Sequence, residues 1–445
     1  MSLMRAFLRS AAYERRFLAK NPWDLAMIVW IPLLAVLMIW WVFFQTKITD
    51  LPIGVIDNDH SPTAYTLVRY LEATPDITVA NTYRSQAAAE AAILRRDIYG
   101  VVTIPNDFER NILSGKPSPV VLQVNAQYGT HSGIVQKSVQ SVVATLSAGV
   151  EIQRLVKQGV VPSQATIAAS PISIQRISLF NAATDYQQFL ASTIIPALLH
   201  ILAMVVGATT IGRELRDKQI GRWYRFIDTG NPDLTLLNKT SIDETKPANR
   251  FDKTSVNKDR LDAKKSDAST PPKLRAPNQV SMLVVLFGLT GKYFWPILAY
   301  SLWSILAIWL ATQQHSIVLS SIIITYISLV ILMVLSFWLG AIFTLTSFSL
   351  RAGLSAAGFI SAPSYAFAGV TYPYIAIKDS AKYWADALPL THYLKLHIAQ
   401  LQMKTPVMVS LPIMYGLMLA VVIAGLVTVL LIKRALAHPE RWGAR

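Results

Sequence analysis

The chain has 445 residues, of which 53% are hydrophobic and only 15% are charged, whereas soluble domains carry about a quarter charged residues. This composition excludes an ordinary soluble protein, and the complete lack of cysteine excludes disulfides, thiol catalysis and thiolate metal sites. The net charge of +15 is unevenly distributed, since residues 45–185 hold 11 basic and 11 acidic side chains and residues 213–292 hold 16 and 10.

Residues 1–24 predict an amphipathic helix lying on the inner membrane surface. Apolar side chains gather near one face and basic ones lie elsewhere: Met4, Phe7, Leu8, Ala11, Phe17 and Leu18 against Arg5, Arg9, Arg15, Arg16 and Lys20. The alternative is an ordinary basic flank that orients the first span. Residues 25–44 contain no charge and are long enough to cross about 30 Å of hydrocarbon as a helix. We interpret them as a retained first span.

Residues 45–185 predict an extracytoplasmic α/β domain. Short β-type runs (PIGVID, ITVA, YGVVTI and PVVLQV) alternate with helical stretches, and a long helical pattern follows at 132–157. This rhythm is typical of βαβ units. Asp57 and Asp59 lack the remaining residues of a calcium loop, so we interpret them as turn residues that close a strand and cap the helix at Ser61-Pro62.

The remaining apolar segments predict five further spans, which makes the fold an α-helical polytopic membrane protein with six transmembrane helices. They are expected at 186–212, at 279–311 with the segment that leads into the membrane, and at 317–346, 352–371 and 407–432. The 85 residues from 293 to 377 contain only one charge, Arg351, and polar breaks divide them into three spans. Excess positive charge falls in alternate connecting segments, which predicts cytoplasmic N- and C-termini, the latter being the tail 433–445.

Two cytoplasmic segments lie between the second and third spans. Residues 213–226 are charged, whereas residues 227–278 are polar and nearly free of aromatic side chains, so we expect the latter to be a disordered insertion. The sequence GLTGKYF at 288–294 lacks the spacing of a phosphate loop. The chain is therefore expected to bind no ATP and no other cofactor itself, and to need a separate ATPase if ATP drives it.

Several motifs in this order resemble type-2 ABC exporter permeases of the branch with a large periplasmic domain. They are GRELRDKQIGRWYR (212–225), GKYFWPILAY (291–300), SFSLRAG around Arg351, and AGVTYP (368–373) followed by Trp384 and LPLTHYL (388–394). The resemblance covers nearly the whole chain except 227–277, where relatives usually have a short connection. It implies a permease subunit of an ATP-driven exporter that moves substrate outward from the cytoplasm or inner leaflet.

The resemblance also implies roles for particular residues. Residues 213–226 correspond to the segment that couples to the ATPase, with Glu214, Leu215, Arg216, Asp217 and Lys218 as its candidate residues. Residues 373–404 correspond to outer re-entrant helices. The candidates for the translocation pathway or gate are His200, Arg351, Tyr372, Pro373, Pro389 and His392. For His200 the alternative is a neutral side chain bonded to a neighbouring helix, and for Arg351 it is contact with inner headgroups.

The expected partners are a cytoplasmic P-loop ATPase carrying ATP and Mg, a second copy or a sibling permease, and membrane lipids, without nucleic acid. Family analogy adds a periplasmic adaptor and an outer-membrane channel, and places the protein in a bacterial inner membrane. A receptor or scaffold with an extracytoplasmic ligand-binding domain is the alternative function, and a membrane-embedded enzyme is a weaker one. Acidic residues are lacking within the spans, which argues against a proton-driven carrier.

Overall fold

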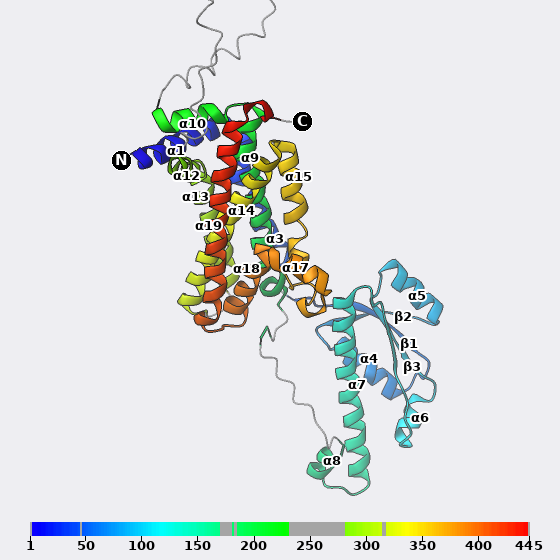
Figure 1. Cartoon of the computed structure of the whole chain (residues 1–445). Coiled ribbons are helices and arrows are strands. Elements are labelled where there is room, and N and C mark those ends of the chain that lie inside the picture. The colour runs from blue at the N-terminus through cyan, green and yellow to red at the C-terminus, as the bar shows by residue number, and fades with distance from the viewer. Residues whose placement is uncertain are drawn as a thin grey trace, which may run out of the picture. The chain divides into compact units, whose positions relative to one another are not determined.

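The computed structural model describes residues 2–44, 47–169, 180–181, 185–230, 281–313 and 317–443. These divide into two compact units (Figure 1): a helical unit, Met1–Phe44 with Phe180–Arg445, and an α/β unit, Gln45–Leu179. The predicted disordered insertion at 227–278 lies outside the described residues except for its first four positions. Residues 227–229 belong to the helix Ile220–Thr229, and Gly230 ends that helix.

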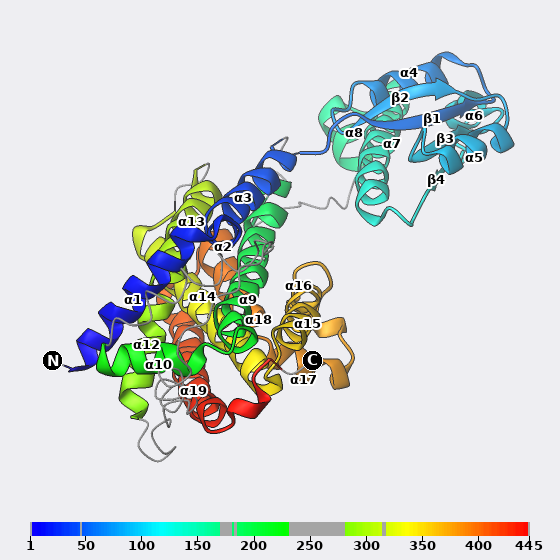
Figure 2. The same cartoon turned by 90° about the horizontal axis from the view of Figure 1, so that it is seen from above.

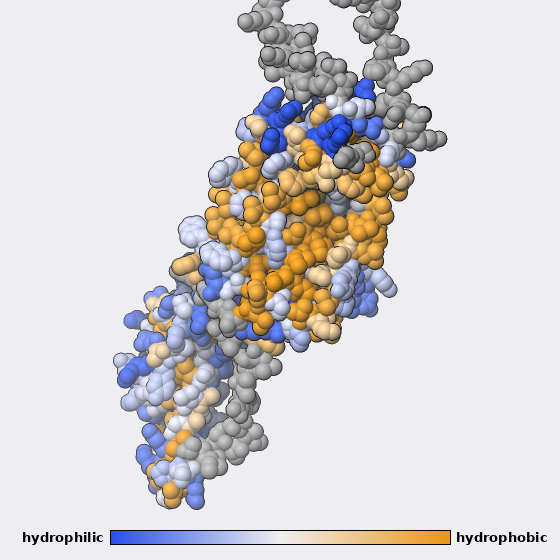
Figure 3. Space-filling model, turned by 90° about the vertical axis from the view of Figure 1, so that its left-hand side faces the viewer, coloured by the Kyte–Doolittle hydropathy of each residue, from blue (hydrophilic) through white to orange (hydrophobic). Residues whose placement is uncertain are grey.

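Five helices in the described part of the helical unit are long and apolar enough to cross a membrane. The first is Pro22–Val42, made of α2 (Pro22–Ile28) and α3 (Trp30–Val42). The others are Gln187–Arg216, made of the π-helical turn η1 (Gln187–Ala191) and α9 (Ser192–Arg216), then α13 (Phe294–Thr312), α14 (Leu319–Ser347) and α19 (Val407–Ala437). Figure 3 shows hydrophobic residues over much of one face of this unit. The prediction of a polytopic helical membrane protein is thereby confirmed.

The predicted fifth span, residues 352–371, is not one continuous helix. It forms α15 (Leu350–Ser361) and α16 (Ser364–Phe367), with a turn at 362–363. Pro363 has no backbone N–H to donate, so the helical ladder is interrupted there. Helical periodicity over this apolar stretch could not reveal that break.

The chain between α15 and α19 nevertheless passes from one end of α9 to the other. Leu350 packs against Gly212 near the C-terminal end of α9. At the opposite end, the Gln402 side-chain amide donates to Gln188 O (3.0 Å) and Ser192 Oγ (3.1 Å). The intervening short helices are η5 (Tyr374–Ala376), α17 (Asp379–Ala387), α18 (Pro389–His397) and η6 (Ile398–Gln402).

Helices α9 and α14 pack closely because glycines lie at their crossing. A Cβ at Gly207 would clash with Phe337 O, and one at Gly340 would clash with Met204 O. The Tyr293 hydroxyl donates to Gly207 O at 2.9 Å, which ties the start of α13 to the same crossing. Close approach of backbones through small residues is a common way to pack helices in membranes.

The α/β unit contains the four strands that the sequence predicts. In chain order its elements are β1 (Leu51–Asp57), α4 (Pro62–Glu72), β2 (Ile77–Thr82), α5 (Gln86–Arg95), β3 (Gly100–Ile104), α6 (Phe108–Leu113), β4 (Val121–Val124), α7 (Gly129–Lys157) and α8 (Pro162–Ala169). The sheet order is β2-β1-β3-β4; β1 is parallel to β2 and β3, and β4 is antiparallel to β3. Leu67 and Leu71 of α4 and Val135 and Val139 of α7 are buried against strand residues in its core.

The acidic residues hold the loop after β1, as predicted, but the prediction that they cap α4 is wrong, because Ser61 caps this helix. Asp57 accepts from the amides of Asp59 and His60, and Ser61 caps α4 through the Ala64 amide at 3.1 Å. The Asp59 carboxylate accepts hydrogen bonds from the amides of Phe108 (2.8 Å) and Glu109 (3.0 Å) at the start of α6. Both acidic residues therefore have structural partners.

Candidate functional site: a buried ion-pair cluster

Three further helices meet the C-terminal end of α9. They are α1 (Ser2–Lys20), α10 (Ile220–Thr229) and α12 (Met282–Lys292), which lie side by side in both views (Figures 1 and 2). Close contact of α1 with α12 requires Gly291, because a Cβ there would clash with Phe7 O. The Trp223 indole of α10 donates to Ser10 Oγ of α1 at 3.1 Å.

Four buried side chains of α1, α9 and α12 and the partly exposed Asp24 of α2 form what we name the buried ion-pair cluster: Glu14, Asp24, Arg213, Glu214 and Lys292. The Lys292 ammonium lies 2.7 Å from Glu214 Oε1 and 3.2 Å from Glu14 Oε2. Arg213 forms an ion pair with Glu14 and lies 3.3 Å from Asp24 Oδ1. The side chains of Glu14 and Lys292 are completely buried, so these charges compensate one another without water.

Aromatic rings cover the cations of the cluster. The Arg213 guanidinium lies 3.8 Å from the centre of the Phe17 ring. The Lys292 ammonium lies 4.9 Å from the Tyr13 ring and 5.7 Å from the Trp223 ring. A desolvated cation gains from the negative face of an aromatic ring, so these contacts favour the charged forms in a dry site.

The charge state of the cluster follows from its geometry. Burial alone would raise the pKa of Glu14, but the positive charges of Lys292 and Arg213 and their hydrogen bonds hold its pKa below the usual range. Burial, together with the nearby carboxylates of Glu214 and Glu14, raises the pKa of Tyr13 well above that of a free tyrosine. Glu14 is therefore an anion and Tyr13 a neutral phenol at physiological pH.

The candidate coupling residues divide into two sets. Glu214 and Leu215 are buried, and Glu214 belongs to the buried ion-pair cluster. Arg216, Asp217 and Lys218 are exposed; Arg216 Nε pairs with Asp217 Oδ1 at 2.9 Å, and Lys218 has a positive φ of 55° at the turn into α10. Only the second set can meet a partner protein directly.

Among the candidate pathway residues, His200 is completely buried on α9. Its Nδ1 lies 2.6 Å from Ser336 Oγ on α14. This geometry fits the alternative that the sequence left open, a histidine bonded to a neighbouring helix. Arg351 is exposed and is the second residue of α15.

The other candidates gather around α17 and α18. His392 Nε2 lies 2.8 Å from Asp386 O, and Pro389 begins α18. Both side chains line an apolar cavity of about 680 Å³ with residues of α14 and α19. Tyr372 is exposed and its hydroxyl donates to Ala376 O at 3.3 Å, while Pro373 directly precedes η5. The structure thus brings Pro389 and His392 together but leaves His200 and Arg351 elsewhere.

Sequence reasoning missed Glu14, Asp24, Arg213 and Lys292 as partners of Glu214. Two signals were available: Glu14 is the one acidic residue in the basic segment 1–20, and Lys292 is the one charge between positions 281 and 350. Neither signal could pair them, because 278 residues separate Glu14 from Lys292. In the described part of the chain, no group of three or more acidic or histidine side chains is arranged to hold a metal ion.

Comparison with known proteins gives a partial match to one family. Residues 22–224 match the family described as ABC-2 family transporter protein, over just under half of the chain. No curated protein matches the sequence, and no solved structure matches it. The matched segment contains α2, α3, the α/β unit, α9 and the first half of α10, including Asp24, Arg213 and Glu214.

Proposed function

From the match of residues 22–224 to the ABC-2 transporter family, we propose that the chain is a member of this family and the permease subunit of an ATP-driven exporter. In this proposal a separate cytoplasmic P-loop ATPase binds ATP and Mg, and the permease moves substrate outward. Two permease chains, identical or sibling, form the pathway. The protein resides in a bacterial inner membrane with both termini in the cytoplasm.

The observation that carries the proposal is the buried ion-pair cluster at the end of α9. Arg213 and Glu214 attach this helix to α1 and α12 through charges that have no water to replace a lost partner. A helix of 25 residues extends over about 37 Å, so a tilt imposed at the cluster reaches the far end of the membrane region. Closure of an ATPase against this end can therefore move α9 as a rigid body.

The contact with the ATPase is assigned to the exposed turn between α9 and α10. Arg216, Asp217 and Lys218 present charges to a partner there, whereas Glu214 and Leu215 act inside the permease. The amphipathic α10 buries Trp223 and Ile227 against the helical unit, so force on the turn passes into the cluster. This separates the five coupling candidates into contact residues and transmitting residues.

We infer that the segment from α15 to α18 makes a sixth crossing. The described part of the chain passes from Gly212 to Ser192 of α9 between Leu350 and Gln402. Most side chains of α18 are buried among protein, which suits a re-entrant helix at membrane depth. An adaptor and an outer channel remain expectations from family analogy, and the substrate is open.

The test is affinity purification of the tagged chain from its native membrane, with mass spectrometry and an ATP-hydrolysis assay. We expect a stoichiometric P-loop ATPase, and at least a tenfold lower yield of it with Asp217→Arg. Lys378→Glu, an exposed charge reversal before α17, is the matched control and should retain the ATPase. A stable wild-type complex without ATPase and without hydrolysis would overturn the proposal and favour a receptor or scaffold.

A further inference from the structure

The α/β unit has a groove between α7 and the strand β4. One cavity of about 470 Å³ is lined by Leu122 and Val124 of the strand and by residues of the helix. A second cavity of about 680 Å³ extends it toward α6, and both are lined by Val120, Val143, Ala144 and Ser147. The two cavities therefore form one continuous depression, which we name the α7 groove.

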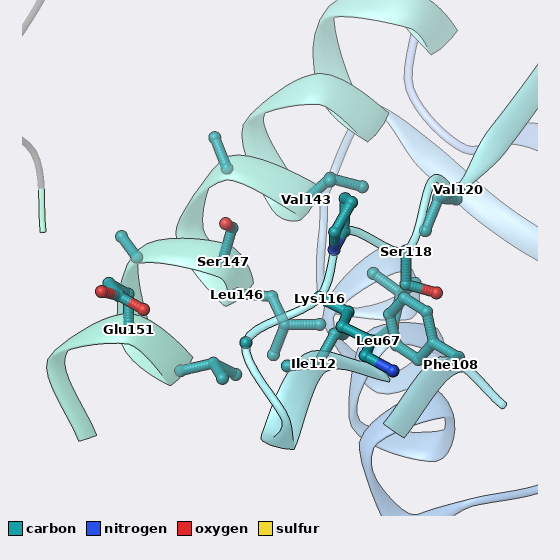
Figure 4. Close-up of a pocket in the computed structure, with 15 residues that line it drawn as sticks. Leu67, Phe108, Ile112, Lys116, Ser118, Val120, Val143, Leu146, Ser147 and Glu151 are labelled. Carbon is teal, nitrogen blue, oxygen red and sulfur yellow. The ribbon is translucent and has the colours of Figure 1, made fainter. Parts of the chain in front are cut away.

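The walls of the α7 groove combine apolar side chains with polar ones such as Ser118, Ser147 and Glu151 (Figure 4). Val143 and Leu146 of α7 face Phe108 and Ile112 of α6 across the second cavity. One polar atom there, Ser118 Oγ, is buried without a hydrogen-bond partner in the described residues. A buried hydroxyl without a partner costs free energy, so a ligand with a donor or acceptor would be favoured at this point.

One side of the groove is a free strand edge. Within the described residues β4 is the last strand of the sheet and pairs only with β3. The Asn125 amide donates to Tyr99 O, so the alternation of an antiparallel ladder directs the backbone groups of Gln123 and Val121 toward β3. The N–H and C=O groups of Leu122 and Val124 consequently point away from the sheet.

The side chains of the same two residues face the groove. Leu122 and Val124 are half-buried and pack on the core under α7. A polypeptide entering as an additional strand would bond to their free backbone groups and place every second side chain in the groove. A lipid or a compact small molecule would fill the groove but would leave the N–H and C=O groups of Leu122 and Val124 unused.

We propose that the α7 groove binds an extended segment of another polypeptide, which pairs with β4 as a fifth strand and buries apolar side chains at alternate positions. The edge supplies affinity through backbone hydrogen bonds, and the groove selects side chains by size and polarity. The exposed amides of Gln136 and Gln140 on α7 border the first cavity and suit polar groups at its rim. This proposal does not depend on the exporter function.

The first experiment selects from a random heptapeptide phage library against the full-length chain in lipid nanodiscs. We expect enriched peptides with apolar residues at alternate positions and affinity at least tenfold lower for Ala144→Trp, which fills the groove. Thr145→Trp is the matched control, because Thr145 is exposed on α7 and lines neither cavity. Unchanged thermal unfolding of both variants establishes that they fold.

The second experiment leaves the protein unaltered and methylates the peptide. N-methylation at the residues that face β4 should weaken binding at least tenfold, whereas N-methylation at the alternate residues should not. Lack of alternation, equal binding to Ala144→Trp, or equal sensitivity to both methylation patterns would overturn strand addition. Peptide-independent binding of anilinonaphthalene sulfonate that Ala144→Trp abolishes, without any selected peptide, would instead assign the groove to small amphipathic molecules.

Discussion

At the level of single residues, Lys292 is the cation that links two carboxylates of the buried ion-pair cluster. Its ammonium contacts Glu14 and Glu214 at once, and neither it nor Glu14 has access to water. The free energy lost when two charges leave water offsets most of the free energy gained from their attraction, so the intact cluster contributes little net stability. We expect its main effect to be on specificity, because the charges favour the arrangement of α1, α9 and α12 in which each has a partner.

We expect Lys292→Met to destabilise the protein by about 3–5 kcal/mol, because it leaves two carboxylates without their shared cation. Glu214→Gln in the same chain removes one of these charges and should recover part of the loss. The measurement is thermal unfolding of the purified protein in detergent. Lys378→Met, a change at an exposed position, serves as the control. An unfolding temperature for Lys292→Met equal to that of the control would contradict a cooperative cluster.

At the level of elements, local patterns predicted the α/β unit well. Alternating apolar residues and turn signals located all four strands, and the pattern expected at 132–157 matches α7, which begins only three residues earlier. Such patterns depend on neighbours in sequence, which is why they succeed there. They gave no sign that Asp59 caps α6 or that Glu14 meets Lys292, since both contacts join distant segments.

The same limit applies to helix packing in the membrane. Hydropathy located five long spans, but it could not show that residues 352–371 divide at Pro363. Hydropathy also could not predict the crossing of α9 and α14. This crossing depends on Gly207 and Gly340, which lie in apolar segments without any distinguishing pattern. Tertiary contact, rather than propensity, decides the spacing of these helices.

Gly340→Ala should therefore be far more harmful than its small volume suggests. The added Cβ meets Met204 O and the Ala208 amide, so α9 and α14 must separate and lose packing along the crossing. We expect a loss of about 1–3 kcal/mol, the usual cost of overpacking. Gly416→Ala on α19 is the control: nothing lies within 4 Å of its Cβ, so helix propensity should make it neutral or slightly stabilising. Equal unfolding temperatures for the two variants would refute close packing at this crossing.

At the level of the whole molecule, the two ends of the helical unit's chain meet at the C-terminal end of α9. Glu14 of the N-terminal helix binds Arg213, and Gly443 of the tail lies beside the backbone of Leu215 and Arg216. Both termini therefore lie on the same side of the membrane region. This arrangement fits an even number of crossings, and in our proposal the segment between Leu350 and Gln402 adds one to the five long helices.

The lack of cysteine makes this topology directly measurable with single introduced thiols. Arg69→Cys places a thiol at an exposed position of α4 in the α/β unit, and Arg222→Cys places one at an exposed position of α10 in the helical unit. The charge distribution predicts a cytoplasmic α10, so an impermeant maleimide should label intact spheroplasts at position 69 only. Permeabilised membranes should be labelled at both positions, and the unmodified chain at neither. Labelling of position 222 alone in intact spheroplasts would show the opposite orientation. Labelling of both positions would show that the α/β unit and α10 lie on the same side of the membrane, which excludes a crossing by α9.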